Sequence, residues 1–135
     1  MTVRDQSQGA APQEIPPAVT GVAHVIAAAR YSLGGLQRLM GETAARLELV
    51  AGAGTGFLLL VLGASALQLA AFAILFALLL AVEALNTAIE VLTDRISPEW
   101  SVQAKHAKDL GSLAVALLII SNALCVGGIL LSLFG

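Results

Sequence analysis

The sequence predicts an all-α membrane protein, with an amphipathic surface helix followed by three transmembrane helices. Apolar residues make up 58% of its 135 residues, against about 45–50% in soluble domains. Charged residues make up 12%, against about 25%. One domain of this length cannot bury so much apolar surface by itself, so we expect lipid to cover it. This composition excludes a disordered chain and a basic nucleic-acid-binding face, and no nucleic-acid partner is expected.

The chain begins with a segment unlike the rest. Residues 1–18 contain Pro12, Pro16 and Pro17 and no apolar run. They lack the basic-then-apolar order of a signal peptide, so they predict a flexible leader. We expect residues 19–135 to form a single membrane-embedded domain.

Residues 19–47 mix apolar side chains at helical spacing with basic residues such as Arg30 and Arg38. This pattern predicts an amphipathic helix on the membrane surface. The Gly34-Gly35 pair predicts a break within it. A short soluble helical hairpin is the alternative for this segment.

The membrane spans follow from two apolar runs. No charge occurs from Leu49 to Val82. At about 1.5 Å per residue, that run is too long for one crossing of a hydrocarbon core of about 30 Å. The pattern continues to Leu92, which leaves room for two crossings joined by a turn at residues 63–65. A third run extends from Leu110 to Phe134. We therefore expect spans near 48–64, 67–92 and 110–134.

The basic residues predict the orientation of these spans. All seven Lys and Arg lie within residues 4–46 or 95–108. The positive-inside rule places the N-terminus and the 95–108 loop in the cytoplasm and the C-terminus outside. Within the loop, Ser97-Pro98 predicts a helix start with Ser97 as N-cap.

Acidic and amide side chains interrupt the end of the second span. Glu83, Asn86, Glu90 and Asp94 fall within a stripe about 80° wide on one helix face. A charge at the bilayer centre costs about 2.5–3.5 kcal/mol, which indicates a functional role. Such carboxylates could hold Mg²⁺, and one left free of metal could act as a general base. A polar seam between packed helices is the alternative.

Lysines follow in the loop. Lys105 and the Lys108-Asp109 pair precede the third span. A lysine ammonium suits phosphate oxygens, and we expect the neighbouring Asp109 to orient Lys108. Together with the acidic stripe, they predict phosphoryl transfer from a nucleotide to a membrane substrate, although no Walker A loop or kinase glycine-rich loop occurs. A small carboxylate-relay transporter is the alternative. It would need polar groups in residues 71–82 and 113–120, and these offer none.

The segments EALNTAIEVLTDRISPEW and AKHAKDLGSLAV resemble the signature region of the prokaryotic diacylglycerol kinase family, most closely its Gram-negative members. The likeness extends from about Thr20 to Gly135. It implies ATP-dependent phosphorylation of diacylglycerol to phosphatidic acid, with Mg²⁺, at the cytoplasmic face of the bacterial inner membrane. It also implies a periplasmic C-terminus and a homotrimer with active sites shared between neighbouring chains. Undecaprenol, which Gram-positive relatives use, is the alternative lipid substrate.

The resemblance also implies roles for individual residues. Glu83 matches the general base at the lipid hydroxyl, and Glu42 and Glu90 match the ligands of Mg²⁺–ATP. Further catalytic roles are implied for Asn86, Lys108 and Asp109. Nucleotide contacts are implied for Tyr31, Glu99, Trp100, Ser101, Lys108 and Asp109. Lipid contacts are implied for Ser112 and for His24, which stands where relatives carry Arg.

Overall fold

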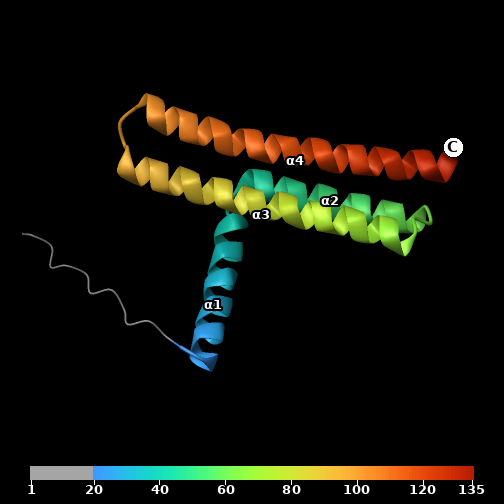
Figure 1. Cartoon of the computed structure of the whole chain (residues 1–135), viewed down its shortest axis with the longest axis horizontal. Helices are drawn as coiled ribbons and strands as arrows, with labels where there is room; N and C mark the ends of the chain where they lie inside the picture. Colours follow the sequence, from blue (N-terminus) through green and yellow to red (C-terminus); the bar gives the residue numbers. More distant parts are fainter. Residues whose placement is uncertain (1–19) are drawn as a thin grey trace, which may run out of the picture.

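The computed structural model describes residues 20–135, and the expected leader lies outside the described residues. The described part consists of helices joined by short turns and loops and has no strand. Its four helices are α1 (Val22–Leu39), α2 (Thr43–Val61), α3 (Ala66–Ile96) and α4 (Val102–Phe134). In Figure 1, α2, α3 and α4 lie side by side and α1 projects away from them. The last three are long and apolar enough to cross a membrane, which confirms the expected fold class.

Helix α1 continues through Gly34 and Gly35, so the expected break at this pair is wrong. A helical glycine weakens a helix but ends it only where the backbone turns left-handed. Neither glycine has a positive φ. The chain instead turns at Met40–Glu42, where Glu42 is the N-cap of α2. Residues 43–47, expected in the surface helix, therefore begin the first spanning helix.

The turn between α2 and α3 lies where the sequence predicts it. Gly63 has a φ of 84°, a left-handed conformation that glycine adopts without steric cost. Ser65 then begins α3 with a capping box. Its backbone N–H donates to Gln68 Oε1 at 2.7 Å, and Gln68 N–H donates to Ser65 Oγ at 3.3 Å. This reciprocal bonding satisfies two N–H groups at the N-terminal end of α3.

The α3–α4 loop is shorter than expected, because α3 continues past the expected end of the second span at residue 92 and α4 begins before the expected start of the third at residue 110. Ser97 is the C-cap of α3, and α4 begins at Val102 with Ser101 as its N-cap. The prediction that Ser97 is the N-cap is therefore wrong. A residue before proline is pushed out of the helical region, so Pro98 favours the end of α3. Ser101 Oγ accepts from the backbone N–H of Ala104 at 3.1 Å and so caps α4.

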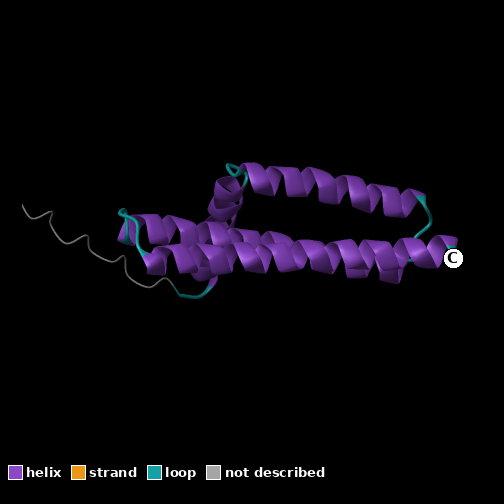
Figure 2. Cartoon of the chain, turned by 90° about the horizontal axis from the view of Figure 1, so that it is seen from above, coloured by secondary structure: helices purple, strands orange, loops and turns teal. Residues whose placement is uncertain are grey.

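Helix α3 is the centre of the fold. Helix α4 packs along it, as both views show, and α2 and α1 also contact it (Figures 1 and 2). Leu59, Phe72 and Ile129 form a buried cluster that joins α2, α3 and α4. In the most apolar stretch of each of these three helices, only 17% of the residues are buried within the chain. Most of the apolar surface therefore remains available to lipid or to other chains.

Candidate active site

A polar cavity of about 320 Å³ lies between α2, α3 and α4. We call it the carboxylate pocket, because four glutamates line it. Its polar lining residues are Glu42, Glu48, Glu83, Asn86, Thr87, Glu90 and Ser112. The structure therefore brings together five residues that the resemblance singled out, from three helices.

Glu83 is the most deeply buried acid of the pocket. Its residue exposure is only 6%, and it accepts no hydrogen bond from any of residues 20–135. A carboxylate buried in this way has both oxygens free for a ligand. A carboxylate in this state can accept a proton.

The two acids expected to bind metal line the same pocket. Asn86 Nδ2 donates to Glu90 Oε1 at 3.0 Å, which orients that carboxylate. Glu42 is paired with Arg38 one turn before it. The described residues contain no group of three or more His, Cys, Asp or Glu arranged to hold a metal. Two carboxylates do suffice for Mg²⁺ when phosphate oxygens complete its shell, so this donor set fits Mg²⁺ bound with a nucleotide.

A second cavity of about 320 Å³ lies at the loop between α3 and α4. We call it the loop pocket. The residues of interest that line it are Asp94, Glu99, Trp100, Ser101, Lys105, Lys108 and Asp109. It therefore gathers five of the six residues expected at the nucleotide. The indole of Trp100 is available for contact, because this residue is 77% exposed.

The lysines of the loop pocket are paired differently from the sequence-based interpretation. Lys108 Nζ contacts Asp94 Oδ1 at 2.5 Å, and Lys105 Nζ contacts Asp109 Oδ2 at 2.5 Å. The expectation that Asp109 orients Lys108 is therefore wrong. Consecutive residues on a helix point about 100° apart, whereas residues four apart share a face. Asp94, the last member of the acidic stripe, holds Lys108 instead.

Lining residues of the two pockets lie about one helical turn apart on α3 and on α4. Glu90 in the carboxylate pocket and Asp94 in the loop pocket are four residues apart on α3. Ser112 and Lys108 are likewise four apart on α4. Four residues correspond to about 6 Å along a helix.

Two expected site residues lie elsewhere. His24 and Tyr31 are on α1, which projects away from the other helices (Figure 1). Tyr31 is 78% exposed, and neither residue lines the carboxylate pocket or the loop pocket. Within one chain, the structure does not bring these two side chains to the acids.

Sequence reasoning missed Glu48 and Thr87. Glu48 Oε2 is buried in the pocket without a hydrogen-bond partner among the described residues. Its sequence signal is weak, because it is simply the last charge before a long apolar run. Thr87 is only 9% exposed. It follows Glu83 by four residues, so the stripe periodicity already placed it on the same face.

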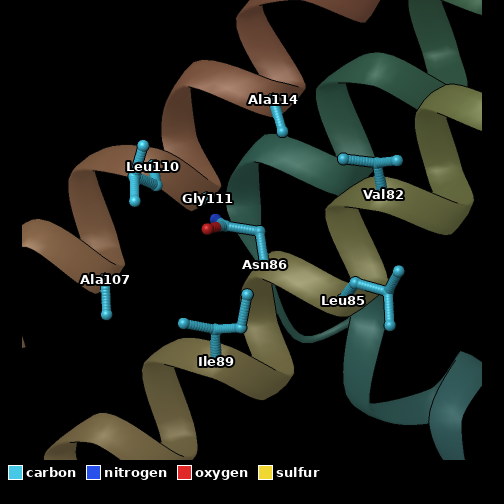
Figure 3. Close-up of a pocket in the computed structure, with 8 residues that line it drawn as sticks. All are labelled: Val82, Leu85, Asn86, Ile89, Ala107, Leu110, Gly111 and Ala114. Atoms are coloured by element: carbon cyan, nitrogen blue, oxygen red, sulfur yellow. The ribbon is translucent and has the colours of Figure 1, made fainter.

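On another side of the α3–α4 contact lies an apolar groove of about 510 Å³ (Figure 3). Its lining residues are Val82, Leu85, Asn86, Ile89, Ala107, Leu110, Gly111 and Ala114. Asn86 lines both this groove and the carboxylate pocket. Its amide is therefore part of the partition between the two spaces.

Comparison with known sequences identifies the family. The sequence model of the prokaryotic diacylglycerol kinase family matches residues 30–131. The chain belongs to this family. It is 53% identical over 103 residues to a diacylglycerol kinase from a Sinorhizobium species, covering 76% of this chain and 75% of that one. It is 34% identical over 112 residues to the Haemophilus influenzae diacylglycerol kinase, covering 82% of this chain and 95% of that one. The Escherichia coli K12 diacylglycerol kinase is 38% identical over 107 residues, covering 75% and 84%.

Membership of the prokaryotic diacylglycerol kinase family confirms the expectation of a membrane-embedded kinase that acts on diacylglycerol. The matched region includes both pockets, since it extends from α1 to the last turns of α4. A nucleotide must supply the phosphoryl group in any such kinase.

Proposed function

We propose that this kinase transfers the terminal phosphoryl group of ATP to diacylglycerol in the carboxylate pocket, with Mg²⁺ as cofactor. The buried, unpaired Glu83 in the carboxylate pocket is the observation that carries the proposal. The acceptor is a lipid hydroxyl, which needs a base at the membrane surface. The donor is a polyphosphate, which needs cations and loop contacts in water.

The depth of the pocket suits such a reaction. A hydrocarbon core of about 30 Å takes about 20 helical residues. Counted from Ala66, the first residue of α3, this length ends close to Asn86. Glu83 and Asn86 then lie near the membrane surface, and Glu90 and Asp94 lie beyond it. A lipid head group and a soluble nucleotide can therefore meet at this stripe.

The chemistry assigned to the pocket is a single displacement. Glu83 accepts the proton of the lipid hydroxyl while the hydroxyl oxygen forms a bond to the γ-phosphorus of ATP. The bond between that phosphorus and the β–γ bridging oxygen breaks, and ADP leaves with the electron pair. Products are phosphatidic acid and ADP, and the proton on Glu83 then passes to water.

Glu42 and Glu90 are the residues that we assign to Mg²⁺. When bound, the ion would neutralise charge on the phosphate oxygens. Asn86 keeps Glu90 oriented through the 3.0 Å hydrogen bond. Lys108, held by Asp94, supplies a positive charge to the phosphates, and Asp109 takes part through Lys105. Glu99, Trp100 and Ser101 surround the remainder of the nucleotide.

A homotrimer with shared active sites is part of this proposal. His24 and Tyr31 are exposed on α1, and neither lines the carboxylate pocket or the loop pocket of its own chain. Across an interface, α1 of a neighbouring chain could bring them to the lipid and the nucleotide. We further propose an inner-membrane location with the loop pocket in the cytoplasm, because the basic residues flank that side.

The proposal is tested by purifying the protein in detergent and assaying it with ATP and Mg²⁺. Diacylglycerol and undecaprenol are supplied side by side in mixed micelles. Formation of phosphatidic acid and an equal amount of ADP is expected with diacylglycerol. A clear preference for undecaprenol would replace the lipid substrate, and ADP formation independent of any lipid would contradict the mechanism.

A further inference from the structure

The packing of α4 against α3 contains one contact that admits no side chain. Gly111 is a buried residue of α4, and Asn86 of α3 lies against it (Figure 3). A β-carbon on residue 111 would lie 2.1 Å from Asn86 Oδ1 and 3.2 Å from Asn86 Cγ. The asparagine carbonyl oxygen therefore occupies the space that any other residue would need for its own side chain.

Asn86 is held at one end only by a hydrogen bond. Its Nδ2 donates to Glu90 Oε1 at 3.0 Å, whereas its Oδ1 is buried with no partner among the described residues. An unpaired buried acceptor is unfavourable, so hydrogen bonding does not explain where Oδ1 lies. The space left by the missing side chain of Gly111 does explain it.

We propose that Gly111 is a positioning residue of the active site, because its bare backbone lets the Asn86 amide orient Glu90. This inference rests on the proposed function, in which Glu90 is a ligand of Mg²⁺–ATP. Gly111 follows Lys108 by three residues and so lies near the same face of α4. Helix α4 thereby contributes to both pockets: Lys108 faces the phosphates, and Gly111 makes room for the amide that orients Glu90.

Replacement by alanine leaves Asn86 little room to adjust. Rotation of the amide alone moves Oδ1 away, but Cγ remains 3.2 Å from the new methyl group. Cγ must therefore shift by a few tenths of an ångström, and because Nδ2 belongs to the same planar amide as Oδ1, the rotation that moves Oδ1 away also moves Nδ2 out of line with Glu90. Helix propensity does not oppose the substitution, since alanine is a better helix former than glycine. A loss of activity in Gly111→Ala would thus not come from a weakened helix.

The test compares wild-type protein with Gly111→Ala, Asn86→Ala and the double variant in the diacylglycerol assay, with Mg²⁺–ATP varied. The matched control is Gly128→Ala, because an added β-carbon there meets no atom within 4 Å. A hydrogen bond to a charged group is worth about a 10- to 100-fold change. We expect Gly111→Ala to lower kcat/KM for Mg²⁺–ATP by about that factor, with KM for diacylglycerol nearly unchanged. Gly128→Ala should behave as wild type.

The double variant separates positioning from simple packing. Without the Asn86 side chain, a methyl group at position 111 has nothing to displace, so the double variant should match Asn86→Ala alone. The same comparison holds if Gly111→Ala misfolds, because removal of the clash should then restore folding. Losses that multiply in the double variant, or a fully active Gly111→Ala, would overturn the proposal. Lack of lipid kinase activity in wild type and in Gly128→Ala would instead refute the proposed function.

Discussion

Replacement of Glu83 by glutamine tests the centre of the proposed mechanism. The amide has nearly the same shape as the carboxylate but cannot accept the proton of the lipid hydroxyl. General base catalysis contributes about 10²- to 10⁴-fold in rate. We therefore expect kcat of Glu83→Gln to fall by at least about 100-fold. KM for Mg²⁺–ATP should change little, because Glu42 and Glu90 are assigned to the metal.

The fold should tolerate this substitution. Glu83 is only 6% exposed and makes no ion pair with any residue of the described range 20–135. Burial of an unpaired charge costs more than burial of a neutral amide. Thermal unfolding in detergent should therefore occur at the same temperature as for wild type, or at a higher one.

The assay follows ADP release in mixed micelles of diacylglycerol with saturating Mg²⁺–ATP, and calorimetry measures nucleotide binding in parallel. Glu83→Asp is the matched control, because it keeps a carboxylate but places it one methylene further from the substrate. It should retain more activity than Glu83→Gln. Near-normal turnover of Glu83→Gln would remove Glu83 from the role of base. Loss of nucleotide binding in that variant would assign it to the metal site instead.

Three further predictions concern the neighbouring residues. Glu42→Gln and Glu90→Gln should each raise the Mg²⁺ concentration needed for half-maximal rate. The double variant should lose little more activity than either single variant, because both residues serve one ion. Losses that multiply fully would indicate separate sites. Asp94→Asn should raise KM for ATP several-fold. It should lower the free energy of unfolding by less than about 1 kcal/mol, because the ion pair between Asp94 and Lys108 is exposed. An unchanged KM would show that Asp94 does not hold Lys108 for the nucleotide. In the third experiment, inactive Glu83→Gln and Lys108→Leu chains are unfolded and refolded together, and tagged subunits verify that the chains exchange. Activity should return if the two residues act from different chains of one trimer. No recovery would place both residues in one chain.

Much of the fold could be predicted because its signals are local. Hydropathy over about 20 residues is enough to recognise a spanning helix, and the Gly63–Ser65 turn combines a left-handed glycine with a capping serine. The break at Gly34-Gly35 and the cap at Ser97 were wrong for a related reason. Glycine and serine each allow several backbone states, and neighbouring residues such as Pro98 decide among them.

Part of the candidate site could likewise be predicted from local signals, and part could not. The spacing of Glu83, Asn86 and Glu90 on one helix determined that they share a face, since helical periodicity alone requires it. Only the tertiary structure decided that Glu48 completes the pocket, that Asp94 rather than Asp109 holds Lys108, and that Gly111 makes room for Asn86. Those contacts join residues on different helices. Their distances depend on how α2 and α4 pack against α3, and no periodicity within one helix contains that information.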